Sequence, residues 1–528
     1  MGKYVNPGTG KFKISMNSKI YLDKSGLISK TNEAFGTRER FICISRPRRF
    51  GKTMAAEMLA AYYGRGKDAT PLFDKLNVSN CESYCEHLNQ YDCIMINIQK
   101  FLSRSKTVEE MIATLSVKII KDLRQIYPTL NFNDSDHLVD VMEDIYEETN
   151  KPFVILLDEW DCLFRVYKND LQSQRDYLDF LQLWLKDQEY VGLAYMTGIL
   201  PIKKYGTHSA LNMFEEYSMT SPSSYQEYFG FTGAEVGQLT KAYEMNFEEV
   251  KDWYNGYFVE SEMPIYNPMA VSKAIRNRSI ENYWNSTETY EALQAYIQLN
   301  FDGLRDEVIQ LIANVEVSIN PDKFANDMST FKSSDDVLTL LVHLGYLSYS
   351  PITNKVRVPN QEVRREFINA IEDLDDFDEI VRMIKQSEDL LEYIWRQEEE
   401  VVANAIQEIH EKNVSILEYN NENALSCTMT LALYAARNYY SIIRELPTGK
   451  GFADLVFIPK KKHLDKPAMI IELKWDKQAN GAINQIKDKN YISALEEYQG
   501  DLLLVGINYD KQTKKHECLI ESYCKKSS

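Results

Sequence analysis

Residues 41–53, FICISRPRRFGKT, decide the fold of the first part of the chain, because an apolar run leads into a basic turn and then into a helical pattern. Phe41–Ser45 predicts a short buried strand and Thr53–Tyr63 predicts a helix. Between them, backbone N–H groups and a helix N-terminus would face a polyphosphate, as in a P-loop. The stretch departs from GxxxxGK(S/T) at its first position, where Arg46 replaces glycine.

The remaining positions of this turn are those that a P-loop uses to hold a nucleotide. Lys52 would reach the β- and γ-phosphates, and the Thr53 hydroxyl would bind Mg²⁺. We also expect nucleotide contacts from the rest of the turn, which comprises Arg48, Arg49, Phe50 and Gly51. The alternative interpretation is a basic loop that caps a helix. The cofactors expected from this stretch are ATP and Mg²⁺.

A second motif follows further along the chain. The apolar run Phe153–Leu157 predicts a central parallel strand and ends in Asp158 and Glu159, as a Walker B motif does. Asp158 would hold Mg²⁺ through water, while Glu159 would orient or deprotonate the attacking water. The next apolar run leads into Thr197, which either contacts the γ-phosphate or its water, or is a plain strand-to-loop threonine. The two motifs in this order favour an ATPase-type site.

The pattern of strands and helices predicts the domain organisation. Strands that alternate with helices indicate a doubly wound α/β fold over residues 1–230. From residue 231 the pattern turns helical, and residues 335–358 predict a helix followed by a hairpin. An acidic stretch at 372–378 marks a second change in composition. The pattern after it predicts a long amphipathic helical region to about residue 411, a helix at 423–438 and a helix near 480–497. We therefore expect three domains: a P-loop domain at 1–230, a helical, winged-helix-like lid at 231–375, and a further α/β domain at 376–528.

Two apolar strands near the C-terminus carry three charged side chains. One strand contains Asp454, and the next ends in Glu472-Leu-Lys474. Because side chains alternate along a strand, Glu472 and Lys474 share one face. If Asp454 lies opposite Glu472 in an antiparallel pair, the connection is centred on His463, in the middle of the polar loop 459–467. The turn therefore favours the register that brings the two carboxylates together.

Such a pair of carboxylates can hold Mg²⁺ beside a phosphodiester. Asp454 and Glu472 would supply ligands, with the backbone carbonyl of Leu473 as a further oxygen. Lys474 would position the attacking water or stabilise the negative charge of the transition state. The alternative is a half-buried hairpin with a solvated charge pair. That alternative explains less well why the apolar run continues directly into the motif.

The composition limits the class of protein. At 528 residues, two to four domains are expected. The net charge of −18 argues against a surface covered with basic side chains for binding nucleic acid. Residues 450–528, however, contain 14 lysines and 11 acidic residues. DNA would therefore meet least repulsion in the C-terminal segment. The eight cysteines form no CxxC pair, and no apolar run is long enough to span a membrane. We expect a cytoplasmic protein with no membrane contact.

Together the motifs resemble two known families. The segments RPRRFGKT, ILLDEWD, FGFTGAEV and WYNGY…YNP resemble the AAA-ATPase-like domain family, which implies a P-loop ATPase domain of the ASCE type. The segments NENALS, RELPTGKGFADLVFIP, IIELKW and AINQIKDKNY resemble the PD-(D/E)XK nuclease superfamily, which implies an α/β, restriction-endonuclease-like fold. The two resemblances cover most of the chain.

The resemblance to the nuclease superfamily implies further site residues. It assigns the metal to the two carboxylates of the strand motif and catalysis to its lysine. It implies that Glu422, on the preceding helix, supports the metal site. Gln485 and Tyr491, on the following helix, would approach the substrate, and Glu445 is a further implied member.

Three functional hypotheses follow. In the first, the protein binds and hydrolyses ATP, and its nucleotide state controls a Mg²⁺-dependent DNA endonuclease; defence against foreign DNA or mobile-element biology fits by analogy. In the second, a nucleotide-dependent protein with an inactive nuclease fold binds nucleic acid or a signalling partner. The third keeps the nuclease and makes the P-loop a structural nucleotide sensor, because Arg46 replaces the first glycine. A homo-oligomer is an open alternative, since such ATPases often complete their sites at subunit contacts.

Overall fold

The computed structural model describes residues 2–130, 137–202, 211–221, 223–257, 263–284, 290–301, 303–325, 328, 331–413, 422–448, 451–489, 491, 495, 498 and 500–523. For residues 290, 410, 412, 413, 422–424, 445, 447, 448, 451 and 452 it describes the backbone alone. The chain divides into two compact units, Met1–Thr289 with Ser318–Arg365, and Tyr290–Val317 with Glu366–Ser528. The three domains expected with boundaries at 230 and 375 stay a prediction.

A five-stranded parallel sheet forms the centre of the first unit. Its strands are β1 (Phe41–Ser45), β2 (Asp92–Asn97), β3 (Phe153–Asp158), β4 (Val191–Gly198) and β5 (Glu215–Tyr217). They lie in the order β2-β3-β4-β1-β5, and all described pairs are parallel. The strands β1 to β4 coincide with the apolar runs because both of their faces are buried. The predicted α/β fold of the P-loop domain is confirmed.

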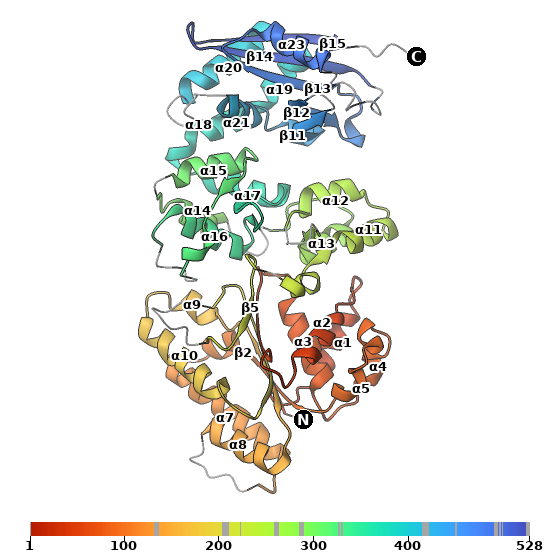
Figure 1. The fold of residues 1–528 in the computed structure, drawn as a ribbon, viewed down its shortest axis with the longest axis vertical. Coiled ribbons are helices and arrows are strands. Elements are labelled where there is room, and N and C mark those ends of the chain that lie inside the picture. Colours follow the sequence, from red (N-terminus) through yellow and green to blue (C-terminus); the bar gives the residue numbers. More distant parts are fainter. Residues whose placement is uncertain are drawn as a thin grey trace. The chain divides into compact units, whose positions relative to one another are not determined.

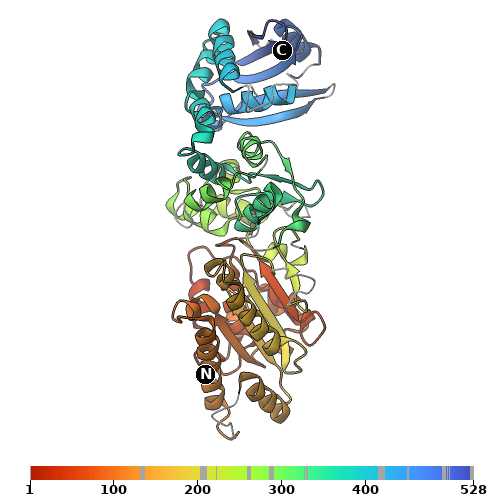
Figure 2. The same ribbon diagram turned by 90° about the vertical axis from the view of Figure 1, so that its left-hand side faces the viewer.

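Helices cover both faces of this sheet (Figure 1). One face carries α1 (Gly10–Met16), α2 (Gly26–Ala34), α3 (Lys52–Tyr63), α4 (Thr70–Phe73) and α5 (Tyr84–His87). The other carries α6 (Ile98–Leu102), α7 (Val108–Ile126), α8 (Leu138–Thr149), α9 (Cys162–Val166) and α10 (Leu171–Leu185), several of which stand in front of the strands in Figure 2. Along β1, Ile42 and Ile44 pack into the first core, while Phe41 and Cys43 pack into the second.

A helical region continues the same unit. Its elements are β6 (Phe231–Thr232), α11 (Gly233–Ala242), α12 (Phe247–Tyr254), β7 (Ile265–Tyr266), α13 (Pro268–Asn277), α16 (Ser334–Leu344), β9 (Ser348–Ser350) and β10 (Lys355–Arg357). The helix α16 and the antiparallel pair β9–β10 confirm the predicted helix and hairpin. Thr232 and Glu235 form a capping box at the start of α11. Lys24 binds the Glu235 carboxylate at 2.7 Å, which ties the N-terminal segment to this region.

The second unit begins with helices. They are α14 (Tyr290–Ile297), α15 (Leu304–Ile312), α18 (Asp378–Lys385), α19 (Ser387–Trp395), α20 (Glu399–Asn413), α21 (Glu422–Ala432), α22 (Ala436–Tyr439) and α23 (Ala479–Asp488). The elements β8 (Val317–Ser318) and α17 (Gln361–Ile371) lie at the boundaries between the units.

The sequence predicted fewer helix breaks than the structure contains. The helical region expected to reach about residue 411 consists of three helices, and Gln397, at φ +58°, lies between α19 and α20. The helix expected at 423–438 is divided into α21 and α22. The helix expected near 480–497 ends at Asp488, and most of the residues after it lie outside the described part. Amphipathic periodicity continues across such breaks and therefore does not reveal them.

A mixed five-stranded sheet completes the second unit. Its strands are β11 (Tyr440–Thr448), β12 (Gly451–Pro459), β13 (Ala468–Trp475), β14 (Leu502–Asp510) and β15 (Lys515–Tyr523), in sequence order. The pair β13–β14 is parallel, with α23 in its connection, and the other pairs are antiparallel. Leu455 pairs with Ile471, so the same register sets Asp454 opposite Glu472. The predicted register is confirmed.

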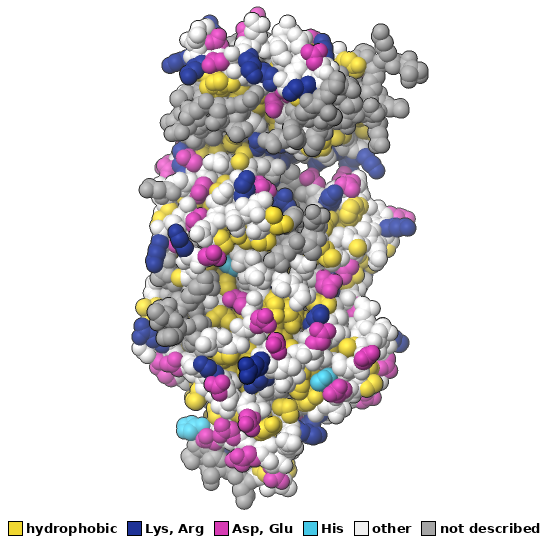
Figure 3. Space-filling view, viewed as in Figure 1, with side chains coloured by type: hydrophobic (Ala, Val, Ile, Leu, Met, Phe, Trp, Pro, Cys, Tyr) yellow, Lys and Arg dark blue, Asp and Glu magenta, His cyan; other side chains and the backbone are white. Residues whose placement is uncertain are grey.

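The surface carries both signs of charge. On the face drawn in Figure 3, Lys and Arg side chains are interspersed with Asp and Glu over the described residues. No helix in the described part of the chain is long and apolar enough to cross a membrane.

Candidate nucleotide and metal sites

The turn after β1 leads directly into α3. Gly51 is the N-cap of this helix at φ +89°, a left-handed conformation that favours glycine. Lys52 begins the helix and is 4% exposed. Its Nζ donates hydrogen bonds of 2.9 Å to the backbone carbonyls of Arg46 and Pro47, and burial lowers the pKa of this amine. The Lys52 amine is therefore held by backbone carbonyl groups of the P-loop itself.

Asp158 is the centre of a hydrogen-bond cluster at the carboxyl edge of the sheet. The Thr53 hydroxyl donates to it at 3.0 Å, the Thr197 hydroxyl at 2.7 Å and the Asn97 amide at 2.8 Å. The threonine and aspartate predicted to share a magnesium ion are thus in direct contact. Asn97 was not predicted, although its position at the end of β2 was a signal, because the ends of parallel strands meet at one edge.

A cavity of ≈ 640 Å³ lies over the P-loop. Its wall includes the predicted residues Arg48, Arg49, Gly51, Lys52, Thr53 and Glu159. Side chains of the N-terminal segment and of the helical region complete it, among them Tyr21 and Met269. This volume is within the range of small-molecule sites. Phe50 does not line the cavity; its ring packs edge-on against Tyr257, so only its backbone can serve a phosphate.

Arg46 has a structural explanation. Its buried guanidinium donates to the backbone carbonyl of Ser45 at 2.9 Å and to that of Tyr217, at the end of β5, at 2.8 Å. Desolvation lowers the pKa of this guanidinium to about 10. The residue that departs from the P-loop pattern therefore connects β1 with the edge strand and does not line the cavity.

The side chains at this edge fit a magnesium–nucleotide complex. A hydroxyl from Thr53 and a carboxylate from Asp158 are hard oxygen ligands of the kind that Mg²⁺ prefers. Arg48, Arg49 and Lys52 supply positive charge along the same cavity wall.

The acidic residues after β3 form an ion-pair network with α9. Glu159, at φ +55°, pairs with Arg165, whose Nε also lies 3.3 Å from Asp161. The fully buried Asp161 carboxylate accepts hydrogen bonds from the backbone N–H groups of Ile199 and Leu200 at 3.1 and 2.9 Å. The network therefore connects Glu159 with the segment that follows β4.

Gly198, at the end of β4, is packed against this network. A Cβ there would lie 2.7 Å from Trp160 Nε1 and 2.8 Å from Asp161 Oδ1. We expect Gly198→Ala to destabilise the protein by about 1–3 kcal/mol, because the crowded side chains must shift. Thermal unfolding measures the loss, with Gly10→Ala as the control, since a Cβ at Gly10 meets no atom within 4 Å. A Gly198→Ala protein as stable as the wild type would contradict the prediction.

The predicted catalytic set of the second unit lies on two adjacent strands. Glu472 and Lys474 of β13 are buried, and the lysine Nζ donates to Glu472 Oε1 at 2.8 Å. Asp454 of β12 is on the same face, because it occupies the opposite position in the antiparallel register. Its Oδ2 accepts a hydrogen bond of 2.7 Å from the backbone N–H of Leu473. The structure brings the three side chains together.

Glu472 is an acid with a perturbed pKa in this site. It is 1% exposed, and its Oε2 has no hydrogen-bond partner among the described residues. Desolvation and the nearby charge of Asp454 raise its pKa to about 7. A buried carboxylate oxygen without a donor, beside a second carboxylate, fits a divalent cation. The described residues contain no group of three or more His, Cys, Asp and Glu that could hold a metal.

The structure describes the side chains of only some of the further residues that the resemblance implies for this site. The Gln485 amide donates to Glu472 Oε1 and to the Tyr491 hydroxyl, the latter at 3.1 Å, so Gln485 of α23 reaches the carboxylate directly and Tyr491 is linked to it through Gln485. Glu422 begins α21 and Glu445 lies in β11. The side chains of these two glutamates lie outside the described part of the structure.

Comparison with protein families agrees with the two sites. Residues 8–207 match the family model described as a predicted AAA-ATPase, and residues 420–518 match the PD-(D/E)XK nuclease superfamily. The chain carries an AAA-ATPase-like domain and a PD-(D/E)XK superfamily domain. The first match contains the P-loop and Asp158, and the second contains Asp454, Glu472 and Lys474.

Individual relatives are more distant. An uncharacterized protein encoded in the vnfD 5′ region of Azotobacter chroococcum mcd 1 is 26% identical over 276 residues, which is 51% of each chain. The chain therefore spans about half the length of this curated relative.

Solved structures give only weak matches. The Aeropyrum pernix ORC2 protein in ADPNP–ADP complexes has a TM-score of 0.30 and 10% identity, over 67% of this chain and 96% of that one. Cdc6p from Pyrobaculum aerophilum has a TM-score of 0.25 and 10% identity, over 67% and 97%. The Aeropyrum pernix ORC1 protein in complex with DNA has a TM-score of 0.24 and 13% identity, over 68% and 94%. TM-scores this low do not define the fold of the present chain.

The raised pKa of Glu472 predicts a pH dependence for the PD-(D/E)XK domain. Its folded-state pKa of about 7 lies above the ordinary value of 4.5, so the folded state binds more protons between these pH values. Its contribution to stability therefore falls as pH rises through this window, by about 3 kcal/mol at most. We expect Glu472→Gln to gain stability relative to the wild type from pH 4.5 to 7, as measured by denaturant unfolding without metal. A difference that does not change with pH would contradict this.

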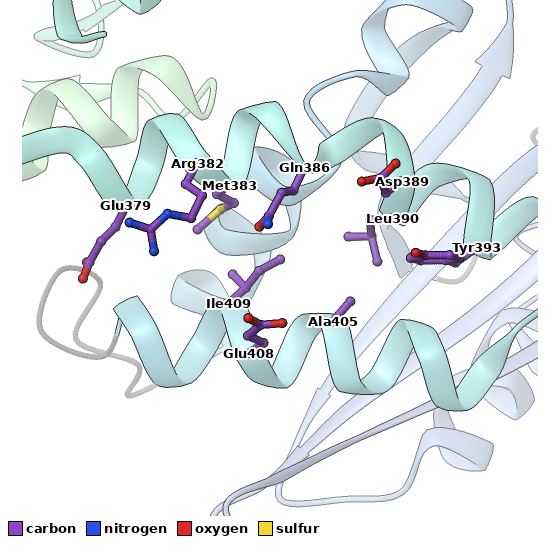
Figure 4. Close-up of a pocket in the computed structure, with 10 residues that line it drawn as sticks. All are labelled: Glu379, Arg382, Met383, Gln386, Asp389, Leu390, Tyr393, Ala405, Glu408 and Ile409. Carbon is purple, nitrogen blue, oxygen red and sulfur yellow. The ribbon is translucent and has the colours of Figure 1, made fainter. Parts of the chain in front are cut away.

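A further groove lies in the second unit, between α18, α19 and α20 (Figure 4). It has a volume of ≈ 170 Å³, and Met383, Leu390 and Ile409 form its apolar part. It contains no predicted site residue, and it lacks the Asp454–Glu472–Lys474 set.

Proposed function

We propose that the protein binds and hydrolyses ATP, and that its nucleotide state controls a Mg²⁺-dependent DNA endonuclease in the C-terminal domain. The nuclease part of the proposal rests on the buried Glu472 carboxylate. One of its oxygens accepts a hydrogen bond from Lys474, and the other has no donor among the described residues. A carboxylate that stays ionised in such a buried site costs free energy unless a ligand compensates its charge. Asp454 on the neighbouring strand supplies the second carboxylate.

The nucleotide half rests on the cluster around Asp158. Thr53, from the P-loop, and Asp158, from β3, are the oxygen ligands offered to Mg²⁺. Lys52 would exchange its bonds to the loop carbonyls for bonds to phosphate oxygens. Glu159, on the cavity wall, would take the proton of the attacking water. Thr197 holds Asp158 in place through its hydroxyl.

In the nuclease site, each side chain has a separate task. Asp454 and Glu472 would hold the metal, which when bound polarises a phosphoryl oxygen and lowers the pKa of its water. Lys474 would stabilise the negative charge of the pentavalent transition state or position the water. Gln485 orients Glu472 through its amide and contacts the Tyr491 hydroxyl. Leu473 fixes Asp454 by its backbone N–H.

The test is incubation of the purified protein with plasmid, linear and single-stranded DNA, with and without Mg²⁺ and ATP. We expect cleavage of DNA that requires Mg²⁺ and that changes in rate when ATP is added. Absence of cleavage of all three DNA substrates would contradict the proposed nuclease activity. Cleavage at a rate that ATP does not change would contradict the proposed control by the nucleotide state.

A second candidate is a nucleotide-dependent binding protein with an inactive nuclease fold. The Lys474–Glu472 ion pair favours it, because the lysine already engages one oxygen of the carboxylate pair, and no third acidic ligand joins that pair among the described residues. Calorimetric titration with Mg²⁺ separates the two candidates. Binding that is lost in Asp454→Asn supports the nuclease, and absence of binding supports the binding protein.

A further inference from the structure

We propose that Arg165 is a positioning residue for ATP hydrolysis, which orients the Glu159 carboxylate toward the nucleotide cavity. This inference rests on the proposed ATPase activity. Arg165 lies on α9, and its guanidinium contacts Glu159 Oε2 directly. The other carboxylate oxygen, Oε1, makes no hydrogen bond to any residue that the structure describes, and Glu159 lines the cavity beside Lys52 and Thr53. One oxygen is thus restrained while the other is left for a water.

The backbone at Glu159 fits this role. Its φ of +55° is a conformation that costs free energy for a residue with a side chain, and such strain gathers at functional sites. The next residue is fixed as well, because the Trp160 N–H donates to the Thr197 carbonyl at 3.0 Å. The same threonine binds Asp158 through its hydroxyl. Glu159 therefore projects from a turn whose two neighbours are both tied to the end of β4.

Asp161 anchors the arginine. Its carboxylate is fully buried and caps the N–H groups of Ile199 and Leu200, directly after β4. Arg165 follows it by one helical turn and lies 3.3 Å from the same oxygen. The carboxylates of Asp161 and Glu159 both attract the Arg165 guanidinium. Arg165 therefore bridges the buried Asp161 and Glu159 on the cavity wall. A change in the segment after β4 would thereby reach Glu159 through two side chains.

A purely structural ion pair gives a matched comparison within the same unit. Arg65 pairs with the buried Asp92 at 2.7 Å and also contacts Tyr127. None of these three residues lines the nucleotide cavity. Loss of that pair should lower stability without a specific effect on turnover, because breaking a buried pair leaves its partner unsatisfied.

The experiment compares full-length wild type, Arg165→Gln, Arg165→Lys and Arg65→Gln. Steady-state ATP hydrolysis gives kcat and KM, and thermal unfolding gives the folded fraction. We expect Arg165→Gln to lower kcat by ~10-fold or more, since misplacing a general base forfeits part of its 10²- to 10⁴-fold effect. KM for ATP should stay within about threefold of the wild type, because the P-loop contacts are retained. Arg165→Lys, which keeps the charge, should recover part of kcat.

The controls separate the possible failures. Arg65→Gln should unfold at a lower temperature and keep the wild-type kcat per folded molecule. A wild type without ATP turnover would overturn the proposed ATPase activity, and this inference with it. An active wild type with an unchanged kcat in Arg165→Gln would overturn the positioning role alone. A kcat that falls only in proportion to the folded fraction would also overturn the positioning role, because a structural pair requires no more than that.

Discussion

Lys474→Ala is expected to lower Mg²⁺-dependent cleavage of DNA by ~100- to 1,000-fold, the cost of removing one donor to transition-state charge. Lys474 is 5% exposed and its amine donates to Glu472, so its loss also leaves that buried carboxylate without its ion-pair partner. The pKa of Glu472, already raised to about 7, should then rise further, which weakens metal binding near neutral pH. Initial rates of plasmid cleavage at several Mg²⁺ concentrations measure both effects.

The matched control for this variant is Lys385→Ala. Lys385, at the end of α18, also pairs with a carboxylate in the second unit, that of Glu372 at 2.6 Å, but both side chains of this pair are exposed. An exposed pair contributes little to stability, so cleavage and unfolding should both match the wild type. Unchanged cutting by Lys474→Ala, with the folded state intact, would remove the proposed mechanism.

Glu159→Gln is expected to lower the kcat of ATP hydrolysis by ~10²- to 10⁴-fold, which is the usual contribution of a general base. The substitution keeps the shape of the side chain, and Lys52 and Thr53 stay on the cavity wall. KM for ATP should therefore change little. Stopped-assay turnover and calorimetric ATP binding, measured on the same preparation, distinguish a loss of chemistry from a loss of binding.

A surface substitution of the same kind serves as the control. Glu109→Gln changes an exposed glutamate in the first turn of α7, away from the cavity. Its turnover should equal that of the wild type. If Glu159→Gln also turns over ATP at the wild-type rate, Glu159 is not the base. Absence of turnover in both proteins would instead support a P-loop that acts as a nucleotide sensor.

Several features of the fold were predictable because they are local. The strands β1, β3 and β4 follow from continuous apolar runs, since a strand buried on both faces has little room for polar side chains. The register of β12 and β13 followed from the polar loop between them, because a hairpin loop fixes which residues face each other. That register already placed Asp454 and Glu472 on one face.

Other features depended on packing between distant segments. Edge strands β5 and β15 have less continuous burial, so their sequences gave no clear signal. The contacts of Asn97 with Asp158 and of Lys24 with Glu235 join residues far apart in the sequence. Such pairs require the order of the strands and the placement of the helices, which periodicity within one segment does not encode.

The sequence alone determined which side chains could do chemistry: the P-loop lysine, the acids that end β3, and the Asp, Glu and Lys of the second sheet. Only the tertiary structure decided their surroundings. Packing buries Glu472, which raises the pKa of its carboxylate to about 7, and it brings Arg165 into an ion pair with Glu159. The physical reason is that residue type and spacing set the donors and acceptors, whereas burial and partner charges set their energies, and these arise only when separate elements pack together.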